Sequence, residues 1–328
     1  IDDSLLNDTE VNNLFNFLET RDASYSQLNI SKSKIQRNDA LEKLGQFNTE
    51  ISKEASLMDH LTELSFIVSN TTVTIQLYSK KPVKNLLISM LIYVISYTIN
   101  VSDNNILTLN ISYYLSNKPK LMNTPHLKKP NINSGYCQFW DSQSNIVIYR
   151  TEEILKVTIH ELIHALRFDY NGSGNDPNKL INLYKNKYNV TLESINSNEA
   201  YTEIWANILH SYLLSKLFGK NRLVFIILLQ YEKLFTMLQF IKVNKLITDK
   251  SYDINKYTNV LAYFIIRGEL FNDIHKFLRF CRMTNKKYIK ITNIPKYTNY
   301  LFNLQKLTIN LPIHKTLKDT ARMSGFSI

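Results

Sequence analysis

The spacing of apolar residues changes along this chain, and that change constrains the fold more than any other feature. Apolar residues alternate with polar ones, as in β-strands, over 73–78 and 106–115, and shorter strand-like segments cover 136–140 and 146–149. From about 178 onward the apolar spacing is almost wholly helical. We therefore predict an α+β fold in which a mixed β-sheet precedes a mainly α-helical C-terminal lobe.

The length of 328 residues suits one large domain or two closely packed lobes. Residues 1–65 are polar, and their apolar residues recur at helical spacing, so a helical N-terminal region is predicted there. The strand-like segments belong to a predicted core over 66–215, and the helical segments beyond it form a predicted C-terminal lobe over 216–328.

The formal net charge of +11 favours acidic partners such as nucleic acid. The lysines are scattered, however, with short pairs such as Lys80 and Lys81, whereas a nucleic-acid surface needs clustered charge. Nucleic acid is therefore a disfavoured partner. The apolar run 86–99 is shorter than the ~20 residues that cross a bilayer, and the run 223–229 is shorter still, so no membrane span is predicted. No sequence feature indicates an oligomeric state.

The two cysteines, Cys137 and Cys281, are too few for a disulfide framework. No signal peptide opens the sequence, so we expect a reducing compartment, either the cytoplasm or a virion. The abundance of Asn, Ile, Lys and Tyr is typical of an AT-rich genome and fits a large DNA virus or an AT-rich microbe.

Residues 160–164 read His-Glu-Leu-Ile-His, an H-E-x-x-H pattern inside a predicted helix capped by Thr151. Positions i and i+4 share one helix face, so the imidazoles of His160 and His164 can bind one metal ion. Two neutral nitrogens suit Zn²⁺, which keeps an open coordination position in catalytic sites. Glu161 can lie beside a metal-bound water and act as the general base in attack on a carbonyl.

The alternative to a metal site is a buried helix whose two histidines and one glutamate hydrogen-bond to each other. Burying such a polar trio without a metal ion is costly. The apolar Leu162 and Ile163 between the polar residues make the helix resemble a core element, which favours the metal site.

A catalytic zinc site needs a third protein ligand. No third histidine follows the motif at short range, and Asp169 lies at the predicted end of the helix. The next helix carries Glu199 and Glu203 at i and i+4, which again share a face. One of these carboxylates can bind the metal while the other hydrogen-bonds a histidine ligand from behind.

The H-E-x-x-H pattern followed by Asn-Glu-x-x-x-Glu at 198–203 resembles the thermolysin-like gluzincin superfamily of zinc metallopeptidases. The family pattern has Asp where this chain has Glu203. The resemblance covers about residues 70–215 and includes the order strand–helix–strand–strand–strand–helix. It implies that 66–215 is a zincin-like catalytic core and that the edge strand 136–140 pairs with an extended peptide substrate.

The resemblance also implies a role for each motif residue in hydrolysis of peptide bonds by a metal-activated water. One zinc ion is expected, and the substrate is expected to be a peptide or a protein. The implied ligands are His160, His164 and Glu199; the implied general base is Glu161; and Glu203 and Asn198 are implied to support the ligands from behind.

A peptidase also needs a donor that stabilises the oxyanion, usually His, Tyr or Arg. The helical C-terminal part of the chain supplies several such side chains, and Tyr263 and Arg267 share a helix face at i and i+4. The candidates assigned to this role are His210, Tyr263 and Arg267.

Two other functions remain as alternatives. The first is a binding or structural protein that keeps a zincin fold without catalysing a reaction. Loss of the general base is the simplest way to inactivate such a site, and the candidate base Glu161 is present here. A nucleic-acid-associated protease would fit the positive charge. Such H-E-x-x-H proteases use a third histidine, however, and here no histidine follows before His210.

Overall fold

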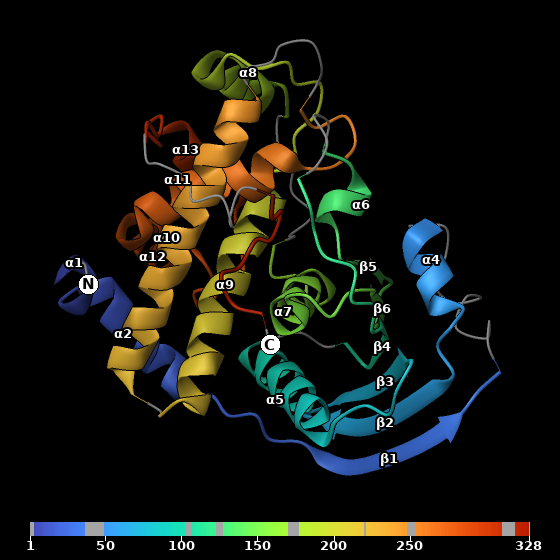
Figure 1. Ribbon diagram of the computed structural model, residues 1–328. Coiled ribbons are helices and arrows are strands. Elements are labelled where there is room, and N and C mark those ends of the chain that lie inside the picture. The colour runs from blue at the N-terminus through green and yellow to red at the C-terminus, as the bar shows by residue number, and fades with distance from the viewer. Residues whose placement is uncertain are drawn as a thin grey trace. The chain divides into compact units, whose positions relative to one another are not determined.

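A computed structural model of the chain is shown in Figure 1. It describes residues 3–36, 49–102, 106–122, 127–169, 177–219, 221–247, 254–309 and 319–327. The chain forms two compact units, each assembled from separated stretches. The sheet unit comprises Thr20–Lys120, Asn133–Leu166 and Ser327–Ile328, and the helical unit comprises Ile1–Glu19, Leu121–Ile132 and Arg167–Phe326.

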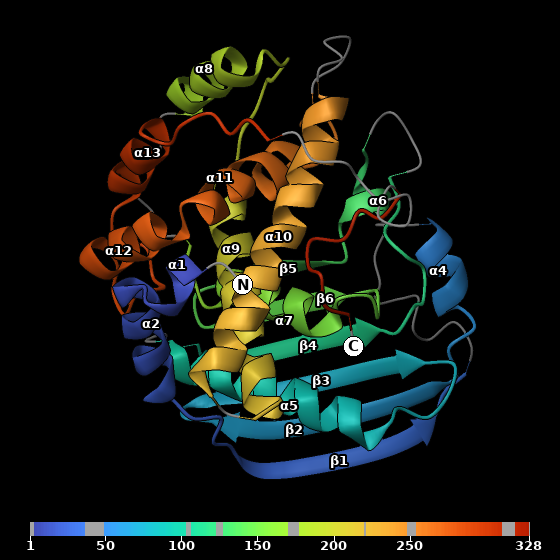
Figure 2. The same ribbon diagram turned by 60° about the vertical axis from the view of Figure 1, so that its left-hand side comes forward.

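The sheet unit is built on one six-stranded mixed sheet with the strand order β1-β2-β3-β4-β6-β5 (Figure 2). Its outer pairs β1–β2, β2–β3 and β5–β6 are antiparallel, whereas β3–β4 and β4–β6 are parallel. The strands are β1 (Ser26–Lys34), β2 (His60–Val68), β3 (Thr71–Ser79), β4 (Thr108–Tyr114), β5 (Gly135–Phe139) and β6 (Gln143–Ile148).

Helices cover both faces of this sheet. The parallel pair β3–β4 requires a crossover, and the apolar helix α5 (Asn85–Val101) supplies it and packs against α7 (Ile154–Ala165). On β4, Tyr113 reaches Thr158 of α7, whereas its neighbour Tyr114 joins a core cluster with α4 (Thr49–Ala55). Successive strand residues point to opposite faces, so α7 and α4 lie on opposite sides of the sheet.

The helical unit is organised around two long helices that pack together, α9 (Asn198–Leu217) and α10 (Arg222–Leu246). Most of α9 is buried, so this helix is the centre of the unit. The other helices among the described residues of this unit are α1 (Asp3–Leu6), α2 (Thr9–Glu19), α6 (Lys129–Ile132), α8 (Pro177–Tyr188), η1 (Leu261–Ile266), α11 (Arg267–Asn272), α12 (Ile274–Thr284) and α13 (Ile294–Phe302).

Among the described residues, α10 is the one helix long and apolar enough to cross a membrane by length and composition. Its most apolar window is 56% buried inside the structure, and core helices of soluble proteins pass the same test, so the evidence for a span is weak. The prediction of no membrane span rested on the apolar run 223–229, which ends at polar residues. The helix continues through Gln230 and Glu232, whose side chains are buried.

The predicted α+β class is confirmed, with a mixed sheet in the first half and helices in the second. The prediction that residues 1–65 are helical is wrong for β1 and for the start of β2. All nine side chains of β1 are exposed, so the strand lacks the buried alternation by which β3 and β4 were predicted.

Candidate metal centre

The start of α7 is fixed by a buried ion pair in the sheet unit. Lys120 Nζ lies 2.7 Å from Glu153 Oε2, and the two side chains are 1% and 0% exposed. Glu153 precedes the helix in a left-handed conformation, with φ at 60°. The predicted cap by Thr151 is wrong: its hydroxyl donates to Ser116 O at 3.0 Å, so the chain turns once more and the helix begins at Ile154.

Two side-chain contacts then hold α7 on the sheet. The hydroxyls of Thr158 and Tyr113 lie 3.0 Å apart, which ties the middle of the helix to β4. Near its end, Ser144 Oγ donates to the carbonyl oxygen of Ala165 at 3.3 Å, which satisfies one of the carbonyls that a helix leaves unpaired. The helix that carries the motif is therefore anchored at both ends and in its middle.

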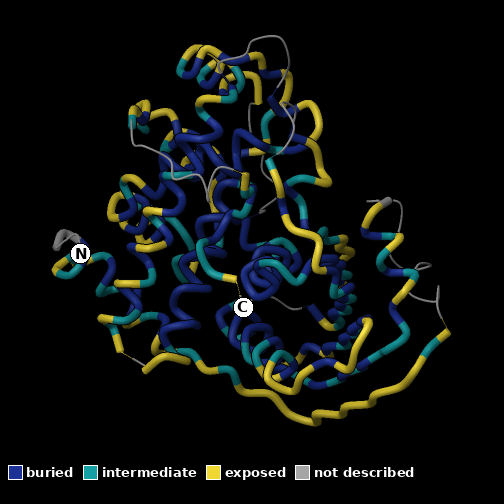
Figure 3. The backbone as a smooth tube through the Cα atoms, viewed as in Figure 1, coloured by how far each residue is buried: buried dark blue, intermediate teal, exposed yellow. Residues whose placement is uncertain are grey.

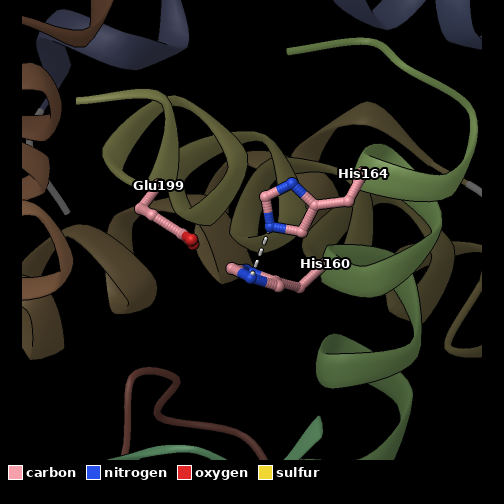
Figure 4. A group of neighbouring side chains, drawn as sticks. All are labelled: His160, His164 and Glu199. Carbon is pink, nitrogen blue, oxygen red and sulfur yellow. Dashed lines mark hydrogen bonds between the residues drawn. The ribbon is translucent and has the colours of Figure 1, made fainter. Parts of the chain in front are cut away.

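The two motif histidines face each other on one side of α7, as Figure 4 shows. The Nε2 atoms of His160 and His164 are 3.1 Å apart, and their rings meet edge to face. Two ligands of a tetrahedral zinc ion at 2.0–2.1 Å would be separated by about 3.3 Å. The spacing of the two nitrogens therefore fits a shared metal ion, although it also fits a hydrogen bond between a protonated and an unprotonated nitrogen.

Glu161 lies against the first residue of the edge strand β5. A Cβ atom added at Gly135 would come 3.0 Å from Glu161 Oε1 and 2.9 Å from the carbonyl oxygen of Val147. Real side chains do not approach a backbone atom so closely, so this position needs glycine. The absence of a side chain at Gly135 is what allows the carboxylate of Glu161, which is 5% exposed, to reach the strand.

Tyr149, which follows β6, belongs to the same surroundings. Burial raises the pKa of Tyr149 well above its usual value, the negative charge of Glu161 adds to that rise, and Arg150 opposes it. The phenol therefore stays neutral throughout the physiological range. It adds no negative charge beside the carboxylate.

The two glutamates of the second motif lie in the helical unit, and Figure 4 draws Glu199 with the histidines. Glu199 is in the first turn of α9, where Asn259 Nδ2 donates to its Oε1 at 3.5 Å. Glu203 lies one turn further along and pairs with Arg267 at 3.4 Å. Asn198 begins α9, and its N–H donates to Asn196 Oδ1 at 3.2 Å.

Arg267 is a fully buried ion-pair partner inside the helical unit. It is 0% exposed, and besides Glu203 its guanidinium donates to Asn207 Oδ1 at 3.3 Å and to the carbonyl oxygen of Met323. These contacts give Arg267 a structural role in holding α9, α11 and the residues near the C-terminus together. Its assignment as an oxyanion donor therefore finds no support in its contacts.

The other two oxyanion candidates are also buried side chains of the helical unit. His210 on α9 is 2% exposed, and its ring lies edge to face with that of Phe326 at 6.1 Å. Tyr263, in the π-helical turn η1, is 6% exposed. The oxyanion role of both residues stays a prediction.

Three residues of the sheet unit support the motif but were not found from the sequence: Gly135, Lys120 and Tyr113. A signal existed for Gly135, because it is one of only 7 glycines and directly precedes a predicted strand. Lys120 and Tyr113 carried no such signal. In the sequence, a lysine that will be buried cannot be told from a surface lysine, and Tyr113 is one of 20 tyrosines.

No protein-family model, curated protein or solved structure matches this chain. The resemblance to gluzincins consequently rests on the motif residues themselves.

Proposed function

We propose that this chain is a zinc-dependent metallopeptidase that hydrolyses peptide bonds. The observation that carries the proposal is the pair of imidazoles on α7, whose Nε2 atoms face each other at 3.1 Å on the same helix as the buried carboxylate of Glu161. That carboxylate also lies against the edge strand β5, where an extended peptide can pair. A base, a metal-binding pair and a strand edge therefore belong to one unit.

The ligands we propose are His160, His164 and Glu199, each of which offers one ligand atom to a metal ion. Two nitrogens and one oxygen are the donors of many catalytic zinc sites, and they leave a fourth position open. That Glu199 joins the two histidines is part of the proposal. The ion pair between Glu203 and Arg267 supports it indirectly, because it anchors α9 one turn beyond Glu199.

A bound zinc ion would polarise the scissile carbonyl and lower the pKa of a water molecule. Glu161 accepts the proton of that water as it attacks and passes the proton to the leaving amine. The edge strand β5 binds the substrate in an extended conformation and presents its peptide bond to the carboxylate. The substrate class is accordingly an extended segment of a peptide or protein.

The test is hydrolysis of a denatured protein such as casein by the full chain, with and without 1,10-phenanthroline. We expect cleavage that the chelator abolishes and that zinc restores. The variant Glu161→Gln keeps the shape of the side chain but cannot accept a proton, so we expect it to lose about 10²–10⁴-fold in rate. Cleavage that persists both in the presence of the chelator and in Glu161→Gln would refute the proposed mechanism.

A second candidate is a binding protein that does not turn over substrate. The observation that favours it is the same 3.1 Å spacing, since two imidazoles can share a proton at that distance without any metal ion. A wild-type chain that binds no zinc and cleaves nothing would support this candidate.

A further inference from the structure

The strand β1 forms the edge of the sheet opposite to β5. In the part of the chain that the structure describes, β1 pairs only with β2, so the main-chain groups on its other side form an open ladder. Figure 3 shows β1 exposed along its whole length. Long exposed edges of this kind are templates for pairing with another strand.

One face of β1 is apolar over half of its length. Ile30 lies opposite Leu64 of β2, a buried residue on the face that α5 covers. Leu28 lies where the pairing with β2 is irregular, between Ser26 and Asn29, and it lines the same cavity beside α5 as Ile30 does. The exposed fraction is 37% for Leu28 and 48% for Ile30. Apolar side chains left this exposed on a strand indicate a surface that can be covered.

A groove of about 500 Å³ runs between this face of β1 and the flank of α5. Its strand side is formed by Leu28, Ile30 and Lys32, and its helix side includes Ile88 and Ile92. Since α5 stops short of covering β1, an added strand could place its own side chains over the groove.

The groove ends at a basic patch. Lys32 lies at its polar end and donates to Asn85 Oδ1 at 2.9 Å. Lys32, Lys34 and His60 line an adjoining cavity of about 250 Å³. The nearest acid on β2, Glu63, lies on the other face of the sheet, where its Oε1 accepts from Gln76 at 2.9 Å. Asp59, which precedes β2, lies 3.8 Å from His60. The α5-side face of β1 is therefore apolar at one end and carries the two lysines at the other.

We propose that the β1 edge binds an extended acidic peptide segment of a partner protein by strand addition. The segment carries apolar residues at two alternating positions, which cover Leu28 and Ile30, and acidic residues at the next two, which face Lys32 and Lys34. Main-chain hydrogen bonds supply affinity, and the order of the side chains supplies specificity. This inference does not depend on the proposed peptidase activity.

A second copy of this chain is a poorer occupant of the same edge. The sequence of β1, SQLNISKSK, contains no acidic residue, so pairing of two β1 strands in any register leaves Lys32 and Lys34 without a partner of opposite charge. Lysines on an edge strand oppose self-pairing for this reason. An acidic segment turns the same two lysines into favourable contacts.

The test is fluorescence anisotropy of the full chain with two labelled peptides, one for each strand direction. The probes are Glu-Thr-Glu-Thr-Val-Thr-Val for an antiparallel addition and Val-Thr-Val-Thr-Glu-Thr-Glu for a parallel one. We expect one of them to bind at least about tenfold more tightly than its counterpart with Lys in place of Glu. Failure of both probes to bind would overturn the proposal.

A charge swap makes the test specific to this surface. The double variant Lys32→Glu with Lys34→Glu should reverse the preference, so that the Lys peptide binds and the Glu peptide does not. The matched control is Lys53→Glu with Lys118→Glu, which changes the same charge at two exposed lysines of another cavity of the sheet unit. An equal effect of the control would contradict the proposal, because it would show attraction by net charge alone.

The apolar half is tested by Ile30→Thr, which keeps a β-branched residue in the strand, and circular dichroism confirms that each variant is folded. We expect weaker binding of the Glu peptide. Sedimentation of the unlabelled chain measures its oligomeric state. A dimer that dissociates in Ile30→Thr would mean that the β1 edge joins two copies of the chain, and it would overturn the proposal.

Discussion

The strands at the two edges of the sheet, β1 and β5, carry different chemistry. At β5, Gly135 brings the strand against the carboxylate of Glu161, so that edge lies beside a group that can move a proton. At β1, all side chains are exposed and the C-terminal end of the strand carries Lys32 and Lys34. This edge therefore offers a binding surface but no reactive group. The chemistry of an edge strand therefore depends on what packs behind it.

The largest effect is expected where α7 is anchored behind the β5 edge. Replacing Lys120 with Met leaves Glu153 buried without its cation, and breaking a buried pair in this way costs about 3–5 kcal/mol of unfolding free energy. Urea denaturation measures the loss. The double variant Lys120→Met with Glu153→Gln removes both charges and should recover part of the stability; an equal loss in both variants would mean that the pair does not anchor the helix.

A smaller effect is expected for Gly135→Ala at the β5 edge. The added methyl group would meet the carbonyl oxygen of Val147 at 2.9 Å, so the strand or Glu161 must move at a cost of about 1–3 kcal/mol. The proposed cleavage of casein should fall as well, because the carboxylate is displaced. Binding of the Glu peptide at the β1 edge should be unchanged, and a loss there would show that the two edges are coupled.

The smallest effect on stability is expected at the β1 edge itself. Ile30 is 48% exposed, and Ile30→Thr should change the free energy of unfolding by about 0.5 kcal/mol or less. The casein assay should give the wild-type rate for this variant. A large destabilisation would instead place Ile30 in the core of the sheet unit and remove it from the docking surface.

The sequence predicted those elements whose burial leaves a periodic pattern. The strand β3 alternates cleanly, with Val73, Ile75 and Leu77 buried. The helix α7 was predicted from the apolar residues within and around the H-E-x-x-H motif, such as Leu162 and Ile163, which are buried. The strand β1 was missed because none of its side chains is buried, and a strand without a buried face has no alternation to detect.

The candidate site shows the same limit. Spacing within one helix predicted that His160 and His164 face each other, because i and i+4 positions always share a face. The approach of Gly135 to Glu161 depends on how a strand and a helix pack, and the pairing of Arg267 with Glu203 depends on how two helices pack. Contacts between distant segments leave no local pattern, so these two were not predictable.

The most direct test of the central claim is the zinc content of the purified full chain, measured by inductively coupled plasma mass spectrometry after dialysis. We predict about one zinc ion per chain, retention of that ion in Glu161→Gln, and its loss in His160→Ala, because a single tetrahedral site needs every protein ligand. Zinc well below one ion per chain, at a level that His160→Ala leaves unchanged, would contradict the account.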